Sequence, residues 1–180
     1  SHKFGGPKGV GVMVLKTGKH LEPLILGGGQ ERDRRSGTHN VAGIIATAKA
    51  LEVTDSTRVS ECERVSVMRD RLVDEIRAAL DGVLETVPRQ HRVPGAAHLC
   101  FSGVENEALL FLLDQVDVCT SAASACASGA MEPSHVLEAM GIERSWSNGA
   151  LRLSLGHTTT NADIDKAVSA IVSAVNQLRR

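Results

Sequence analysis

The end of the chain carries its clearest hydrophobic pattern. Apolar residues recur there at steps of four, three, four and three positions: Ile164, Val168, Ile171, Val175 and Leu178. These steps put the side chains on one face of a helix, and they predict a helix over residues 161–178. Thr160 and Asp163 stand where the two partners of a capping box would lie at its start.

Shorter apolar runs and helical spacings alternate through the rest of the chain. Continuous apolar runs predict strands at 10–15, 24–26, 83–87, 96–101, 116–120 and 150–155. Helical spacing predicts helices at 41–51, 65–80, 105–114 and 134–140. Strands and helices mixed in this way indicate an α/β or α+β architecture with both sheet faces covered. The charge-rich stretch 52–62 is the expected boundary between two structural units.

Composition and charge narrow the class of protein. The 180 residues are 42% hydrophobic, which suffices for one medium domain or two small ones. A net charge of −1 gives no reason to expect binding to nucleic acid or to a membrane surface. The sequence has no apolar run near the roughly 18 residues of a membrane span and no secretory signal, so we expect a cytoplasmic protein.

The four cysteines show neither a C-x-x-C pair nor zinc-like spacing with histidine; they are Cys62, Cys100, Cys119 and Cys126. A metal site built from them is therefore not expected. Two disulfides are compatible with the even count, but reduced thiols are favoured because no secretory signal is present.

Three stretches have compositions that suit chemistry better than a core. The first, residues 1–9, places Lys3 and Lys8 among glycines that permit close backbone approach. It lacks the Gly-Lys-Ser/Thr of a Walker A loop. Taken alone, its simpler interpretation is a turn before a strand, with both lysines solvated.

The second stretch, residues 27–40, begins with three glycines and ends where a helix is expected. Its backbone N–H groups, the Thr38 hydroxyl and nearby arginines are suited to hold an anion such as a phosphate. A charged surface loop in which Thr38 or Asn40 caps the helix is an equal alternative.

The third stretch, residues 120–130, consists almost wholly of small residues around Cys126. Such a segment cannot anchor a core, so we expect Cys126 to be accessible and suited to act as a thiolate nucleophile. A free cysteine of no consequence is the alternative. Cys100 and Cys119 lie in apolar strand-like runs and are expected to be structural.

Taken together, these stretches resemble the NifS/IscS-like cysteine desulfurases, fold-type I pyridoxal-phosphate enzymes of the class-V aminotransferase family. Residues 2–9, His-Lys followed by Gly-Pro-Lys-Gly, are similar to the family's cofactor-lysine segment. Residues 27–38 are similar to its Gly-rich and R-S-G-T motifs. Residues 124–137 are similar to its catalytic-cysteine loop with the following helix, and 151–156 to a late strand with a substrate-binding arginine.

The resemblance implies an α/β fold of the fold-type I PLP-dependent transferases. Residues 1–58 would be the end of the PLP-binding large domain, and residues 59–180 the α+β small C-terminal domain with the cysteine loop. The chain opens without Met on a Gly-rich turn. We therefore expect the C-terminal half of an enzyme, which needs the family's N-terminal half for activity.

The resemblance also implies a role for each matching residue. Lys3 would bind pyridoxal 5'-phosphate and move the substrate's Cα proton, and His2 would contribute to binding the phosphate. Thr38 would reach the phosphate of the other subunit's cofactor in a homodimer. Arg152 would bind the α-carboxylate of L-cysteine. Cys126 would take the sulfur as a persulfide, leave L-alanine, and pass the sulfur to an iron–sulfur scaffold or another sulfur-acceptor protein.

One residue departs from the family pattern, and two other interpretations stay open. Asp33 stands where the family commonly has glycine. A selenocysteine lyase or another fold-type I enzyme is one alternative, although Cys126 argues against an aminotransferase, which needs no thiol there. A non-catalytic fragment that docks a sulfur acceptor is the other. Binding of pyridoxal phosphate, visible as colour, separates the enzymes from the docking fragment.

Overall fold

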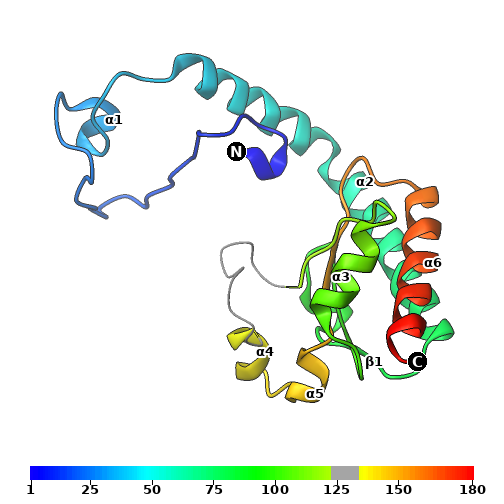
Figure 1. The fold of residues 1–180 in the computed structure, drawn as a ribbon. Coiled ribbons are helices and arrows are strands. Elements are labelled where there is room, and N and C mark those ends of the chain that lie inside the picture. Colours follow the sequence, from blue (N-terminus) through cyan, green and yellow to red (C-terminus); the bar gives the residue numbers. More distant parts are fainter. Residues whose placement is uncertain (123–133) are drawn as a thin grey trace. The chain divides into compact units, whose positions relative to one another are not determined.

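The computed structural model describes residues 1–122 and 134–180, which fall into two compact units, Ser1–Val59 and Ser60–Arg180 (Figure 1). The boundary lies inside one long helix, α2 (Val41–Ala79). No helix in the described part of the chain is long and apolar enough to cross a membrane. The assignment of the two parts to a large and a small domain stays a prediction.

Helix α2 corrects the expectation of two helices separated by a charged junction. It runs without interruption over 39 residues and includes the whole stretch 52–62. That stretch contains no proline or glycine to end a helix. Its charges instead form ion pairs between neighbouring turns, Lys49–Glu52, Arg58–Asp55 and Arg64–Glu61. The polar residues of this stretch lie on an exposed face of the helix. They do not mark the end of one helix and the start of another.

The first unit is mostly irregular before α2. It has a 3-10 turn, η1 (His2–Phe4), and a short turn of helix, α1 (Gln30–Asp33). The strands expected at 10–15 and 24–26 are not formed, so that prediction is wrong. Most of their side chains are exposed, fully so at Leu24 (100%). An apolar run becomes a strand only when a neighbouring strand pairs with it, and the described residues supply no such strand for these runs.

The second unit is built on a three-stranded antiparallel sheet in the order β1 (Val83–Glu85), β2 (Ala96–Phe101), β3 (Ala150–Ser154). All three strands were predicted from the sequence. The predicted C-terminal end of β1 lies two residues beyond the end that the structure shows. A strand expected at 116–120 is absent. The left-handed backbone at Asp117 (φ 55°) interrupts that run. Next to this run, Ser121 pairs with β3 through an isolated bridge to Arg152.

Helices cover the two faces of this sheet unequally. The C-terminal part of α2, α3 (Asn106–Asp114) and α6 (Asn161–Leu178) share one core with the inner face (Figure 1). Its fully buried members include Leu72, Ile76, Leu99, Phe101, Leu109, Leu151 and Ile171. The predicted capping box of α6, Thr160 with Asp163, is confirmed.

The outer face is covered at one end by two short helices, α4 (His135–Ala139) and α5 (Arg144–Ser147). Leu137 and Trp146 of these helices pack with Cys100 of β2 and Ala150 of β3. The sequence predicted α4 but not α5, which is only four residues long. Because strands alternate their side chains between faces, His98 and Arg152 belong to this same outer face.

Two glycines bring the ends of β2 and β3 into close contact. Gly149 precedes β3, and a Cβ there would collide with the carbonyl oxygen of Phe101. Gly95 precedes β2, and a Cβ there would collide with the carbonyl oxygen of Leu155. Each glycine also accepts a hydrogen bond from the residue it faces, Phe101 N at 3.0 Å and Leu155 N at 2.7 Å.

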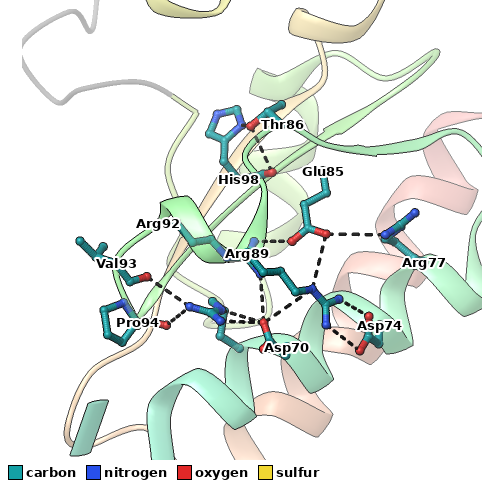
Figure 2. A network of polar contacts seen from close by, with 11 residues as sticks. Asp70, Asp74, Arg77, Glu85, Thr86, Arg89, Arg92, Val93, Pro94 and His98 are labelled. Atoms are coloured by element: carbon teal, nitrogen blue, oxygen red, sulfur yellow. Dashed lines mark hydrogen bonds and ion pairs between the residues drawn. The ribbon is translucent and has the colours of Figure 1, made fainter. Parts of the chain in front are cut away.

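An ion-pair network ties the β1–β2 connection to α2 (Figure 2). Glu85 pairs with Arg77, Arg89 and Arg92, and its side chain is only 11% exposed. Arg92 also pairs with Asp70 at 3.0 Å. Asp74 pairs with Arg89, whose hydrogen bond lowers the pKa of that carboxyl. The buried members, Glu85 and Arg92, hold the connection in place only while their partners are present.

Candidate functional site

Arg152 is the exposed member of a strand whose neighbours are buried. Leu151 and Leu153 on either side are 0% and 4% exposed and face the core, so the pleat turns Arg152 to the outer face. Among the described residues no carboxylate pairs with its guanidinium. An uncompensated guanidinium on an open face is available for an anionic group such as a carboxylate.

The backbone of Arg152 holds the segment that leads to Cys126. Arg152 N donates to Ser121 O at 2.6 Å, and Ser121 N donates to Arg152 O at 3.3 Å. Cys126 itself lies outside the described residues, as do all of 123–133. The Thr120 hydroxyl beside this bridge is buried and has no hydrogen-bond partner in the described part of the chain. The segment of Cys126 therefore begins directly beside the predicted carboxylate-binding arginine.

His98 of β2 lies directly opposite Arg152 of the neighbouring strand β3. The β2–β3 register pairs the two residues, and Thr86 Oγ1 lies 3.0 Å from His98 Nδ1 (Figure 2). Burial lowers the pKa of His98, and the nearby Arg152 guanidinium lowers it further. The ring is therefore neutral around pH 7. His98 was not among the residues predicted from the sequence, although a histidine inside the apolar run 96–101 was a usable signal.

His2 and Lys3 are both exposed in the 3-10 turn η1. The turn ends at Gly5, whose φ of +86° is readily adopted only by glycine. Thr54 of α2 donates to the Phe4 carbonyl at 2.9 Å and so attaches η1 to the helix. The Lys3 amine has no ion pair with any residue that the structure describes. It is thus free to react with a group from outside the chain.

Internal hydrogen bonds hold the loop 27–40 in shape. Ser36 is buried, and its N–H donates to the Ile25 carbonyl at 3.1 Å. Arg35 donates to the carbonyls of Gly37 and Thr38 at 3.1 and 3.2 Å. This arginine therefore supports the loop backbone.

The start of α2 decides which residue caps it. Asn40 Oδ1 accepts from Gly43 N at 3.0 Å, so Asn40 is the cap. Thr38 is exposed, and its hydroxyl makes no hydrogen bond within residues 1–122 and 134–180. The hydroxyl is left available for a group from outside the chain.

Asp33, which departs from the family pattern, lies at a position whose backbone conformation favours glycine. Glu31, Arg32 and Asp33 have φ angles of 51°, 57° and 63°. These lie in the left-handed region, which glycine adopts at least cost and aspartate more readily than most residues. Asp33 therefore keeps the turn that a glycine would make there.

The predicted site residues fall into two groups. His2, Lys3 and Thr38 lie in the first unit, and Arg152 lies in the second, beside the root of the segment of Cys126.

The cysteines that the structure describes differ in how deeply their thiols are buried. Cys100 is fully buried, and burial raises the pKa of its thiol to about 11. Cys119, expected to be structural on a strand, is instead exposed and outside any strand. Cys62 is partly buried.

Comparisons with known proteins agree on one family. The family model described as aminotransferase class-V matches residues 1–167. An IscS-like cysteine desulfurase of Mycobacterium tuberculosis is 44% identical over 180 residues, covering 99% of this chain and 46% of the relative. A cysteine desulfurase IscS of Dictyoglomus turgidum is 38% identical, with 99% and 45% covered. The solved structure of a NifS-like protein matches with a TM-score of 0.86 and 32% identity, covering 98% of this chain and 45% of that one. The chain thus spans about half the length of the relatives it matches.

Proposed function

Because the chain belongs to the class-V aminotransferase family, in its IscS/NifS-like cysteine desulfurase branch, we propose that it forms the C-terminal part of a working cysteine desulfurase. The reaction removes sulfur from L-cysteine, gives L-alanine, and leaves a persulfide on Cys126. The observation that carries the proposal is the bridge between Ser121 and Arg152. This bridge places the residues that lead to Cys126 beside the guanidinium of Arg152, which pairs with no carboxylate of the described residues.

Arg152 binds the α-carboxylate of the substrate in this proposal. A guanidinium presents N–H donors in a planar fork that matches the two oxygens of a carboxylate. The exposed position of Arg152 and the absence of a carboxylate partner in the described residues support this role. Binding of the carboxylate then holds the amino acid near the residues that lead to Cys126.

The residues of the first unit fit pyridoxal phosphate, on which the family depends. Lys3 offers a free amine for the covalent link, and His2 beside it offers a ring N–H to the phosphate. The exposed Thr38 hydroxyl offers a further hydrogen bond to a phosphate, in our proposal that of the second subunit of a homodimer. These three groups have no partner among the described residues that would compete.

The sulfur transfer follows from the thiol and the amine. When bound, pyridoxal phosphate accepts the electron pair released as the bonds at the substrate's Cα and Cβ change. The Cys126 thiolate attacks the substrate sulfur, so that an S–S bond forms while the sulfur–Cβ bond breaks. Lys3 takes the proton from Cα, and the carbon skeleton leaves as L-alanine after protonation. The persulfide then passes to an iron–sulfur scaffold or another sulfur-acceptor protein.

The test uses the full-length protein that contains this chain, loaded with pyridoxal phosphate. We expect equal amounts of L-alanine and sulfide from L-cysteine in the presence of a thiol reductant. Without reductant, mass spectrometry should find one added sulfur atom on Cys126. Cys126→Ser should abolish the persulfide and leave the absorbance of the bound cofactor unchanged.

Cys119→Ser is the matched control, because this thiol is exposed and seven positions away in the sequence. It should keep full activity. Undiminished alanine formation by Cys126→Ser would overturn the proposal. Selenide release from selenocysteine, with none of the sulfide expected from cysteine, would favour a selenocysteine lyase. A colourless protein that cannot take up the cofactor would favour a docking fragment.

A further inference from the structure

We propose that His98, held by Thr86, is a positioning residue that orients the Arg152 side chain toward the substrate's carboxylate. The inference rests on the proposed function, because it takes Arg152 as the carboxylate-binding residue. It assigns a role to a polar row of three residues: Thr86 directly after β1, His98 of β2 and Arg152 of β3. None of the sequence motifs includes either Thr86 or His98.

The row follows from the register of the sheet. Glu85 pairs with Leu99, so Thr86 comes next to His98, and His98 pairs in turn with Arg152. The Thr86 N–H donates to the His98 carbonyl at 3.2 Å, which confirms that the pairing continues beyond β1. Residues directly opposite one another share a face and lie in side-chain contact range. The three side chains therefore stand in line on the outer face.

In this proposal the Thr86 hydroxyl selects the tautomer of the His98 ring. Its hydroxyl lies 3.4 Å from the His98 carbonyl oxygen as a donor, and 3.0 Å from His98 Nδ1. A hydroxyl has a single proton, so when it donates to the carbonyl it accepts from Nδ1–H. In that tautomer Nε2 carries a lone pair and no hydrogen. The ring then presents an acceptor to the N–H groups of Arg152.

A neutral acceptor is the chemically suitable partner for this arginine. A carboxylate at position 98 would orient Arg152 but would also neutralise it and compete with the substrate. An imidazole orients the guanidinium and leaves its whole positive charge for the incoming carboxylate. The lowered pKa of His98 agrees with this, since both burial and the Arg152 charge favour the uncharged ring.

The experiment compares His98→Leu with His98→Gln in the full-length, cofactor-loaded protein. Leucine removes the acceptor, whereas the glutamine Oε1 lies near the place of Nε2. The readouts are kcat and KM for L-cysteine, and the dissociation constants of L-alanine and of ethylamine from the change in cofactor absorbance. Ethylamine has the amine but no carboxylate.

We expect His98→Leu to raise KM and the dissociation constant of L-alanine by about fivefold to tenfold, the effect of one lost orienting hydrogen bond. Ethylamine affinity and kcat should stay within about twofold, because neither depends on the carboxylate. His98→Gln should restore the L-alanine affinity to within about twofold of the unmodified protein. Thr86→Val should cause a smaller loss in the same direction, since it frees the ring to change tautomer.

An unchanged L-alanine affinity in His98→Leu would overturn the inference. Equal losses for L-alanine and ethylamine would overturn it as well, because they would indicate a general disturbance of the fold. The L-alanine comparison does not depend on sulfur chemistry. A protein that binds L-alanine but releases no sulfide from L-cysteine would therefore refute the desulfurase proposal. The L-alanine affinities of the His98 variants would still test the role of His98 in that case.

Discussion

Arg152 and Ser121 exchange two backbone hydrogen bonds, although 31 positions separate them in the sequence. The main chain of Arg152 thereby fixes the start of the segment of Cys126, while its side chain points to the outer face of the sheet. The two roles use different atoms. A side-chain substitution therefore tests carboxylate binding without removing the bridge.

Arg152→Gln should raise KM for L-cysteine in the full-length protein by roughly 10- to 100-fold, because a charge-assisted contact to the carboxylate is worth about 1.5–3 kcal/mol. Steady-state kinetics with L-cysteine measures the effect. Arg144→Gln, an exposed arginine of α5, is the matched control and should leave KM unchanged. Equal KM values for the two variants would show that Arg152 does not bind the carboxylate.

Two described cysteines should differ sharply in reactivity. Cys100 is fully buried and its thiol pKa is raised to about 11, so it carries almost no thiolate at pH 8. Cys119 is exposed. Brief treatment of the native protein with iodoacetamide at pH 8, followed by peptide mass spectrometry, should find Cys119 modified and Cys100 intact. Equal modification after unfolding in urea is the control, and rapid native labelling of Cys100 would contradict the packing beneath α4 and α5.

Much of the second unit was predictable from the sequence, because its elements carry their own local signals. The steps of four and three in α6, its capping box, and the short apolar runs of β2 and β3 each specify one element. The charged stretch 52–62 contains the division between the two units, as expected, but it does not separate two helices, since charge marks an exposed surface and does not end a helix. The runs at 10–15 and 24–26 misled for another reason, because strand formation depends on a partner elsewhere in the protein.

Motif resemblance points to Arg152, Lys3 and Thr38 as site residues, and their roles stay predictions. The structure describes where each of them lies, but the pairings around Arg152 were not predictable from the sequence. Neither the pairing of His98 with Arg152 nor the bridge to Ser121 has a local signal. Both depend on strand register, which is set by contacts between residues far apart in the chain.

Removal of one carboxylate from the ion-pair network should destabilise the second unit strongly. Glu85→Gln leaves Arg92, whose side chain is 5% exposed, with only part of its charge balanced. The free energy of unfolding should fall by about 3 kcal/mol, as is typical of a broken buried pair. Urea unfolding followed by circular dichroism measures it.

Asp74→Asn is the matched control for this substitution. Its carboxylate belongs to the same network but is 60% exposed, so water screens its ion pair. The loss there should stay below about 1 kcal/mol. Similar losses in both variants would indicate that burial does not govern the network.

The titration of His98 should appear in the pH dependence of stability. Its pKa in the folded protein is lowered from the ordinary value of 6.5, by burial first and by Arg152 second. The unfolded chain therefore binds more protons than the folded one between these two pKa values. The stabilisation is present above pH 6.5 and is lost as the pH falls toward the folded pKa.

The free energy of unfolding should thus rise with pH through this window, and His98→Gln should flatten the rise. Urea unfolding at several pH values from about 5 to 7.5 measures the slope. His91→Gln, an exposed histidine in the 3-10 turn Arg89–His91, is the matched control. A slope that survives His98→Gln would contradict the half-buried, neutral state of the ring.

Gly95 and Gly149 oppose a shift in the register between β2 and β3. A strand that slides by one position turns every side chain to the opposite face, which would bury Arg152 and expose Leu151. The carbonyl oxygens of Phe101 and Leu155 leave room only for a hydrogen atom at the two glycines. A slide would bring a side chain into one of these spaces at either end of the pair. These two glycines thus keep His98 opposite Arg152, so under the proposed role of Arg152 a substitution at either glycine would weaken binding of the substrate's carboxylate without touching it.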